Sequence, residues 1–172
     1  AYKQEIMEPG DTIVEGGEYV SYTLQPQAAL TIIDQSTGEV KAIVGGRGDK
    51  VANRTLNRAT DSTRQPGSTF KVLAAYAPAL DGAGMTLATV EDDAPYSYAN
   101  GTSLRNYDGR YRGFTSFRTA ITYSINVVTV KCLTDIGVDN GFSYLQDFGF
   151  TTLKDSDRVQ SLALGGLTDG VT

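Results

Sequence analysis

The spacing of apolar residues near the start of the chain predicts a β-hairpin. Residues 28–34 are apolar and β-branched, the next four residues have turn chemistry, and residues 39–44 alternate polar with apolar side chains before two glycines. The alternation places Val40, Ala42 and Val44 on one face of the second strand. We therefore expect that strand to be half buried.

A first helix is predicted where an apolar run follows a proline–glycine pair. Pro66-Gly67 precedes residues 68–77, whose composition favours a helix. Pro78 is expected to end or kink it, because proline lacks the N–H that a helix interior needs. Residues 81–84 (Asp-Gly-Ala-Gly) are then expected to stop the helix.

Two more helices are predicted in the second half of the chain. One covers about residues 116–136, with Gly137 where a C′ glycine belongs. The next starts after Asp139, which has the chemistry of an N-cap, and reaches about Asp147. Beyond them, residues 161–164 are apolar and expected to be buried.

The remaining stretches have the composition of loops. Residues 1–21 are polar and Gly-rich, which indicates a lead-in or linker. Residues 47–67 are polar and loop-like. Residues 91–114 are rich in Asp, Asn, Gly and Tyr, and a loop of that length is usually functional or disordered.

Composition narrows the chemistry. The chain has 172 residues, which suits one domain, and its net charge of −5 comes without any Lys/Arg-rich run, so nucleic-acid binding has no electrostatic support. It contains no histidine, which excludes Ser-His-Asp and Cys-His catalysis and every His-dependent metal site. We expect no metal and no cofactor. The single cysteine, Cys132, lies in an apolar run and is interpreted as a buried structural thiol.

No apolar stretch approaches the length of a membrane span, and no signal peptide opens the chain. The first and last residues both look like internal cuts. We therefore expect the chain to be a fragment of a longer protein.

Ser68 and Lys71 form the first candidate for chemistry. They lie three residues apart on the predicted helix, so hydroxyl and amine share a face. A serine becomes a good nucleophile when a base takes its proton, and lysine can be that base when burial and positive potential lower its pKa. A helix N-terminus supplies such potential. The other reading makes Ser68 a helix N-cap and Lys71 a solvated helix residue.

Ser124 and Asn126 form the second candidate, because they interrupt the apolar residues of the second predicted helix. A hydroxyl here can pass a proton between Lys71 and a leaving group, and the Asn126 amide can hold a substrate carbonyl. Polar side chains beside a core-facing stretch need partners. The alternative is that both residues are simply tolerated within the helix.

Together these pairs make two of the three motifs of penicillin-recognising enzymes, Ser-x-x-Lys and Ser-x-Asn, the third being Lys-Thr-Gly. Residues 64–71 (Arg-Gln-Pro-Gly-Ser-Thr-Phe-Lys) resemble the nucleophile segment of class A (bifunctional) penicillin-binding proteins. Further segments that resemble this class are residues 25–29, 44–47, 57–60, 106–113 and 118–126. The resemblance spans about residues 22–172.

The resemblance implies a fold and a set of roles. The fold is α+β, the transpeptidase fold shared with serine β-lactamases, in which helices cover both sides of an antiparallel sheet. Residues 22–172 would be the N-terminal portion of that domain. Ser68 would attack the D-Ala-D-Ala carbonyl, Lys71 would be the base, Ser124 the proton relay, and Asn126 a ligand for the substrate amide.

The implied partners are peptidoglycan stem peptides, as D-Ala-D-Ala donor and amine acceptor, and β-lactam antibiotics that acylate the same serine. The resemblance also implies a parent protein anchored at the extracytoplasmic face of the bacterial cell membrane, with an upstream glycosyltransferase domain.

The sequence departs from the family's pattern at one point. No Lys-Thr-Gly triad follows Asn126. In the family the triad lies on a strand that supplies half of the oxyanion hole, so we expect the C-terminal sheet strands to be missing and this polypeptide alone to be weakly active or inactive.

Three other functions remain open. A serine β-lactamase of class A would need a glutamate after the second motif, and no glutamate follows Glu91. A β-lactam sensor would retain all four candidate residues. A fragment with only a structural role is the third.

Within the 91–114 loop, tyrosines either line a peptide groove or pack over the helices. Arg64, Arg112 and Arg118 either bind a substrate carboxylate or form structural ion pairs.

Overall fold

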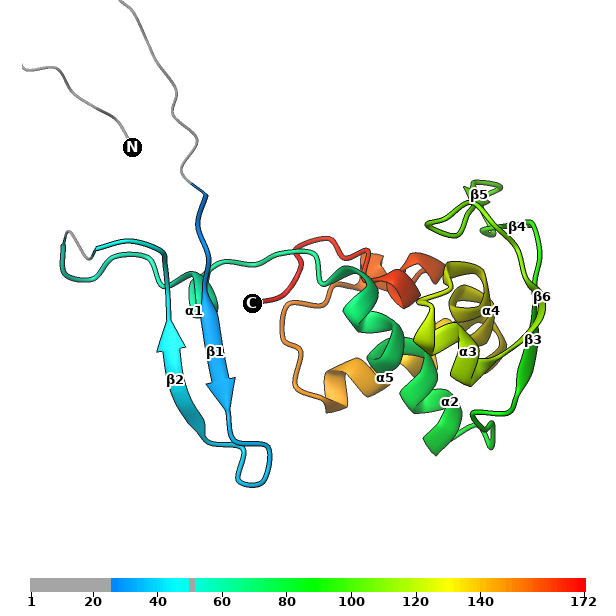
Figure 1. Ribbon diagram of the computed structural model, residues 1–172, viewed down its shortest axis with the longest axis horizontal. Helices are drawn as coiled ribbons and strands as arrows, with labels where there is room; N and C mark the ends of the chain where they lie inside the picture. Colours follow the sequence, from blue (N-terminus) through cyan, green and yellow to red (C-terminus); the bar gives the residue numbers. More distant parts are fainter. Residues whose placement is uncertain (1–25, 50–51) are drawn as a thin grey trace, which may run out of the picture. The chain divides into compact units, whose positions relative to one another are not determined.

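The computed structural model describes residues 26–49 and 52–172, and in it the chain divides into two compact units, residues 1–61 and residues 62–172. Figure 1 traces the elements along the chain. The predicted lead-in over residues 1–21 lies outside the described residues.

The first unit contains the predicted hairpin. Strand β1 (Leu30–Ile33) pairs antiparallel with β2 (Val40–Val44), with Leu30 opposite Val44 and Ile32 opposite Ala42 (Figure 1). The turn between them is closed by Asp34, whose carboxylate accepts a hydrogen bond from the Ser36 amide at 3.0 Å. The hairpin prediction is confirmed.

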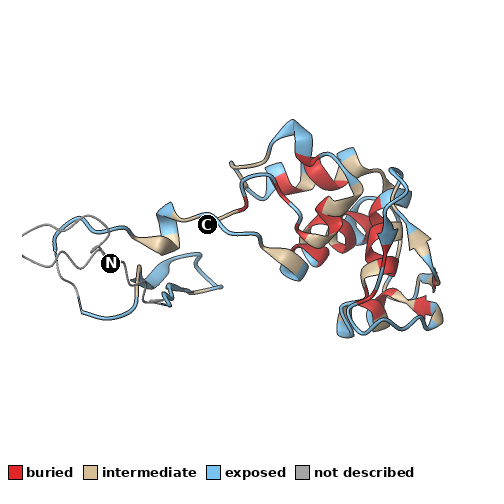
Figure 2. Cartoon of the chain, turned by 90° about the horizontal axis from the view of Figure 1, so that it is seen from above, coloured by how far each residue is buried: buried red, intermediate tan, exposed pale blue. Residues whose placement is uncertain are grey.

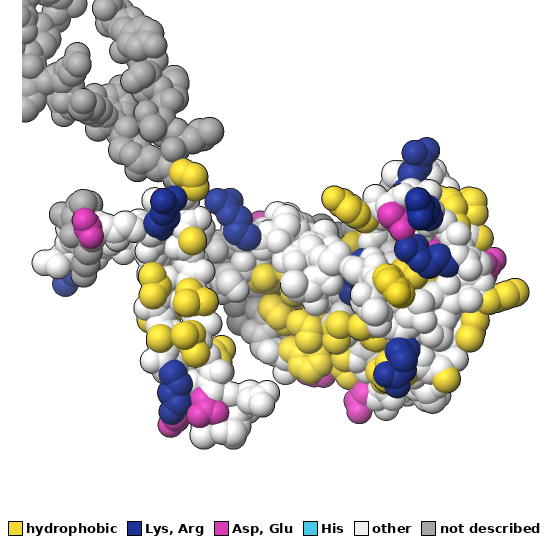
Figure 3. All heavy atoms as spheres, in the orientation of Figure 1, with side chains coloured by type: hydrophobic (Ala, Val, Ile, Leu, Met, Phe, Trp, Pro, Cys, Tyr) yellow, Lys and Arg dark blue, Asp and Glu magenta, His cyan; other side chains and the backbone are white. Residues whose placement is uncertain are grey.

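The expected half burial of the second strand is wrong. Every residue of β1 and β2 is exposed, and Figure 3 shows apolar side chains gathered along the hairpin. Among the described residues of this unit, the one helix is α1 (Arg58–Asp61), which has four residues and buries none of them. So short a helix cannot cover a face of the hairpin.

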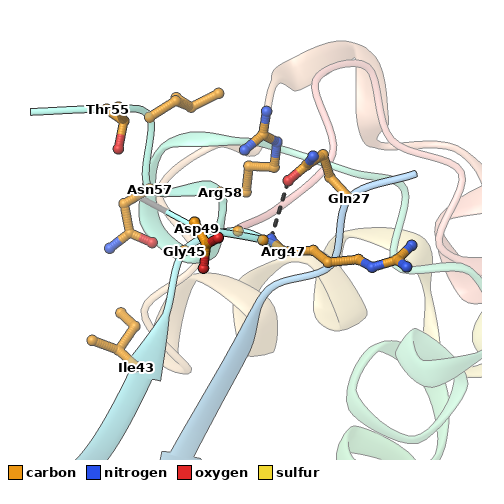
Figure 4. A pocket seen from close by; sticks show the side chains of 11 residues that line it. Gln27, Ile43, Gly45, Arg47, Asp49, Thr55, Asn57 and Arg58 are labelled. Atoms are coloured by element: carbon orange, nitrogen blue, oxygen red, sulfur yellow. Dashed lines mark hydrogen bonds between the residues drawn. The ribbon is translucent and has the colours of Figure 1, made fainter. Parts of the chain in front are cut away.

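A hollow lies where β2 meets the residues before α1. Figure 4 shows it, with a volume of about 560 Å³ and with Arg47 and Arg58 among its lining residues. The Arg47 amide donates to the Gln27 side-chain oxygen at 3.1 Å, and the Arg58 amide donates to the Gly45 carbonyl at 2.9 Å. None of the candidate catalytic residues lines this hollow.

The second unit begins with the helix that carries Ser68. A 3₁₀ turn, η1 (Gly67–Thr69), leads into a helical stretch that widens to π geometry in η2 (Val72–Tyr76) and continues as α2 (Ala77–Asp81). Pro78 does not end the helix. It lies in the first turn of α2, directly after the widened turn, where a missing N–H is tolerated. The helix stops at Asp81 and Gly82, as predicted.

The stretch predicted as one long loop is partly β-structure. Strand β3 (Val90–Asp93) pairs antiparallel with β6 (Gly113–Ser116), and β4 (Tyr96–Ser97) pairs with β5 (Ser103–Leu104). Asn100, Gly101, Asp108 and Gly109 lie in the turns between these short strands, whereas Asp92 and Asp93 belong to β3 itself.

The single helix predicted over residues 116–136 is two helices, α3 (Phe117–Thr122) and α4 (Asn126–Ile136), separated by a break at residues 123–125. Gly137 ends α4 with φ of 89°, as predicted for a C′ glycine. Helix α5 (Val138–Asp147) then starts at once. Asp139 therefore lies within its first turn, and the prediction of Asp139 as N-cap is wrong because Gly137 already turns the chain.

The core of this unit surrounds α4, and Figure 2 shows the buried segments of the unit in red. Val127, Val130 and Leu133 are fully buried, and α4 packs on η2, α5 and the 3₁₀ helix η4 (Gln160–Leu164). A shorter 3₁₀ turn, η3 (Asp155–Asp157), precedes η4. The burial predicted for residues 161–164 is confirmed at Leu162 and Ala163.

Cys132 is also fully buried, as predicted, and burial raises the pKa of its thiol to about 12. A mixed α+β architecture is thus what the described residues form. Among them, no helix is both long enough and apolar enough to pass through a membrane.

Candidate active site

Lys71 is the centre of a polar cluster in the second unit. Its side chain is 4% exposed, and its Nζ donates to Ser124 Oγ at 2.9 Å, to the Ser124 carbonyl at 2.5 Å and to Asn126 Oδ1 at 2.7 Å. The structure therefore brings three of the four candidate residues into direct contact. Lys71 is not a solvated helix residue.

Burial lowers the pKa of the Lys71 amine to about 8. Removing an ammonium group from water disfavours its charged form. With a pKa near 8, about a tenth of the amines are neutral at pH 7. A neutral amine has the lone pair that a general base needs.

Ser68 lies in the turn η1, at the beginning of the same helix, and is exposed. It lies inside the turn, which Pro66 precedes as the cap, so Ser68 is not the N-cap. Within residues 26–49 and 52–172, no hydrogen bond joins Ser68 Oγ to Lys71 or Ser124. Its hydroxyl is thus open to solvent, one helical turn before the buried amine.

Ser124 reaches Lys71 because of an unusual backbone conformation. Its φ of 52° is in the left-handed region, which non-glycine residues seldom adopt. This conformation lies in the break between α3 and α4, and it leaves both the carbonyl and the hydroxyl of Ser124 facing Lys71 Nζ. Strained backbone of this kind often occurs at functional sites.

The turn that carries Ser68 is held from behind by residues near the end of the chain. The Gln65 side chain donates to the Leu167 carbonyl and accepts from the Leu167 amide, the latter at 2.8 Å. Gly165, with φ of 73°, lies so close to Gly67 that an added Cβ would clash with the Gly67 carbonyl oxygen. This support could not be found from sequence spacing, because about a hundred residues separate the two segments.

Asn106 was also missed as part of this site. Its Oδ1 accepts hydrogen bonds from the amides of Asn126 at 3.0 Å and Val127 at 3.2 Å. No local signal in the sequence pointed to it, because residues 116–136 were predicted as one helix. Only the structure shows that α4 starts after Ile125, which cannot cap a helix with its side chain. A helix start without a local cap requires a partner from elsewhere in the fold.

A small pocket opens beside Ser124. It has a volume of about 190 Å³, and Asn106, Tyr107, Arg112 and Tyr123 are among its lining residues. Arg112 forms an ion pair of 2.7 Å with Asp108, which confirms the structural reading for this arginine.

The four tyrosines of the predicted loop differ in their burial. Tyr96 and Tyr98 pack against the core, whereas Tyr107 is fully exposed and Tyr111 is partly exposed. Packing over the helices therefore holds for the first two only. Within the described part of the chain, no group of Cys, Asp or Glu residues has the geometry of a metal site.

Comparison with known proteins places this chain in a family. The family model for the penicillin-binding protein transpeptidase domain matches residues 28–163. Penicillin-binding protein 1A of Clostridium acetobutylicum is 40% identical over 154 residues, which are 83% of this chain and 19% of the relative. The chain thus spans about a fifth of the length of that curated relative.

Solved structures agree. Penicillin-binding protein 1A from Haemophilus influenzae superposes with a TM-score of 0.64 at 30% identity, over 74% of this chain and 19% of that one. Penicillin-binding protein A from M. tuberculosis, solved as a penicillin G acyl-enzyme complex, gives a TM-score of 0.59 at 27% identity, over 70% of this chain and 32% of that one. Sequence, fold and length of match agree, and the chain belongs to the penicillin-binding protein transpeptidase family.

Proposed function

We propose that this chain carries the nucleophile half of a D,D-transpeptidase site that cross-links peptidoglycan stem peptides through an acyl-enzyme on Ser68. One observation supports the proposal most strongly. The Lys71 amine is buried, has a lowered pKa and contacts Ser124 Oγ and Asn126 Oδ1, one helical turn from an exposed serine.

The acylation step uses each of these groups. Ser68 Oγ bonds to the carbonyl carbon of the penultimate D-alanine while its proton passes to the neutral Lys71 amine. The C–N bond to the terminal D-alanine then breaks. Ser124 Oγ, already hydrogen-bonded to Lys71 Nζ, passes the proton to the leaving amine. The products are an ester on Ser68 and free D-alanine.

The second step reverses the roles. An amine of a second stem peptide attacks the ester carbonyl, the bond to Ser68 Oγ breaks, and the proton of the amine returns to Ser68 by way of Lys71. A new amide then joins the two peptides. A β-lactam would acylate Ser68 in the same way, but its amine stays tethered after ring opening, so that the ester persists.

One N–H of the Asn126 side-chain amide is left to orient the substrate. Its Oδ1 accepts from Lys71, and its Nδ2 donates to the Arg105 carbonyl at 2.8 Å and retains a second hydrogen. We assign that hydrogen to a substrate carbonyl. The larger setting, a membrane-anchored parent with a glycosyltransferase domain at the extracytoplasmic face, is a proposal that rests on resemblance to class A proteins.

The experiment is acylation by a fluorescent penicillin, with the modified residue located by peptide mass spectrometry. The full-length protein that carries this chain is compared with Ser68→Ala and with Thr69→Ala, a matched variant that removes the neighbouring hydroxyl of the same exposed turn. We expect one label per molecule on Ser68 in the wild type and in Thr69→Ala, and none in Ser68→Ala. Labelling that persists in Ser68→Ala would refute the proposal.

Two further arms refine it. A label that is released rapidly would indicate a β-lactamase, and a stable label without cross-linking activity would indicate a sensor. Because no Lys-Thr-Gly triad follows Asn126, we expect the 172-residue chain alone to be labelled much more slowly than the full-length protein.

A further inference from the structure

The start of helix α4 has no cap of its own. Ile125 precedes the helix and offers no side-chain acceptor, so that the first backbone N–H groups of α4 need an outside partner. The need is strict at Val127, which is fully buried and cannot reach water. Asn106 Oδ1 accepts from both Asn126 N–H and Val127 N–H. A residue twenty positions earlier thus caps the helix.

The Asn106 amide is itself held in one orientation. Its Nδ2 donates to Asp93 Oδ1 at 2.7 Å and to the Arg110 carbonyl at 2.8 Å. Asp93 is completely buried, and its other oxygen accepts from the Arg112 amide at 3.0 Å. Rotating the Asn106 amide by 180° would set oxygen against carboxylate and N–H against N–H. The buried carboxylate therefore fixes which end of the amide faces α4.

The capped residue is also the one that holds the lysine. Asn126 receives a hydrogen bond from Lys71 at its Oδ1 and donates its Nδ2 to the Arg105 carbonyl. Adjacent residues, Arg105 and Asn106, therefore hold both the side chain and the backbone of Asn126. Ser124 lies two residues before this fixed point, in its left-handed conformation.

From these contacts we propose that Asn106, oriented by Asp93, is a positioning residue that sets Asn126 and Ser124 around the Lys71 amine. This inference rests on the proposed function. It adds Asn106 and Asp93, which lie outside the three motifs, to the residues of the proposed site. Neither Asn106 nor Asp93 contacts Lys71 directly. Their effect on the reaction passes through the start of α4.

A charge swap tests the proposal. Asn106→Asp keeps the size of the side chain and an oxygen for the helix cap, but sets a second carboxylate against Asp93. Asp93→Asn combined with Asn106→Asp restores a donor between the two positions. The control is Asn100→Asp, the same change in the exposed turn between β4 and β5, where the Asn100 side chain accepts a hydrogen bond from the nearby Thr102 amide. The acylation rate with fluorescent penicillin is measured from pH 5 to 9 in the full-length protein, together with the melting temperature.

We expect Asn106→Asp to slow acylation between about tenfold and a hundredfold, since small misplacements of a catalytic group have effects of that size. We also expect the pH midpoint of acylation to shift, because a displaced Asn126 no longer accepts the hydrogen bond that the lysine amine donates to it. The double variant should recover rate and midpoint toward wild type, and Asn100→Asp should change neither. A merely structural role would lower only the fraction of folded protein and leave the midpoint in place.

Two results would overturn the inference. One is Asn106→Asp acylated at the wild-type rate with the wild-type midpoint. The other is a loss of rate that follows the loss of folded protein with the midpoint unchanged. Failure of the proposed function looks different, because then the wild type itself is not acylated at Ser68.

The cap can also be measured without activity, by hydrogen exchange at the Val127 amide of the 172-residue chain. We expect protection in the wild type and exchange at least about tenfold faster in Asn106→Ala, as the loss of about 1.4 kcal/mol of hydrogen bonding would give. Equal exchange in the two proteins would contradict the capping role.

Discussion

At the scale of single residues, Ser124 combines a strained backbone conformation with two contacts to the Lys71 amine. Its left-handed φ lets the carbonyl and the hydroxyl of one residue accept from the same amine. An L-residue in this conformation is less stable than glycine would be, because its Cβ approaches the following carbonyl oxygen. The site therefore retains a serine where glycine would suit the backbone better.

This trade can be measured with two variants. Ser124→Ala and Ser124→Gly both remove Oγ, but only glycine relieves the strain. We expect Ser124→Gly to be more stable than Ser124→Ala by about 1 kcal/mol, the strain released less the greater freedom of glycine in the unfolded chain. Urea unfolding followed by circular dichroism gives the difference. An alanine variant as stable as the glycine variant would show that residue 124 is not strained.

Sequence reasoning found residues better than it found their surroundings. The spacing of Ser68, Lys71, Ser124 and Asn126 made them candidates, because a hydroxyl and an amine one turn apart can react together, and the resemblance to the family's motifs gave each its expected role. It could not find Asn106 or Asp93, since a cap that comes from twenty residues away leaves no local pattern. Long-range contacts of this kind depend on the fold.

At the scale of elements, the turn that carries Ser68 depends on a close backbone approach. Gly165 follows η4 and lies against Gly67, while Gln65 is bound on both sides to Leu167. The segment after η4 therefore supports the turn that carries Ser68. Loss of this contact should affect both stability and acylation.

The expectation is tested by Gly165→Ala with Gly84→Ala as its matched control. Both glycines have positive φ, but an added Cβ clashes with Gly67 at the first position and meets nothing within 4 Å at the second. We expect Gly165→Ala to be less stable than Gly84→Ala by about 1–3 kcal/mol, the usual effect of overpacking. The comparison uses urea unfolding at one temperature. Equal losses of unfolding free energy in the two variants would mean that the positive φ, and not the contact with Gly67, accounts for the need for glycine at position 165.

The helix prediction for residues 116–136 failed at the break that carries Ser124. The pattern of residues 116–136 is that of one helix, yet the chain breaks at residues 123–125 and restarts with a borrowed cap. Similarly, Pro78 does not end its helix, which continues to Asp81 after a widened turn. In both cases tertiary contacts override local preference.

At the scale of the whole molecule, the chain belongs to a family whose curated members are much longer than the chain itself. The match to the transpeptidase family model covers residues 28–163, and the chain spans 19% of the length of a curated relative. The exposed apolar hairpin was not predicted, because strand alternation indicates a buried face without telling what covers it. The fold class could be predicted because longer segments around the two motifs, residues 64–71, 106–113 and 118–126, together resemble the family.

The central claim is that a buried, partly neutral lysine activates Ser68, and the pH dependence of acylation tests it most directly. Since the base is the neutral form and the pKa of Lys71 is lowered to about 8, the rate falls as the amine gains its proton below that pH. We expect the second-order rate constant for fluorescent penicillin to rise about tenfold per pH unit between pH 5 and 7 and to level off above about 8. A rate that is constant across this range, in protein that remains folded, would contradict the account.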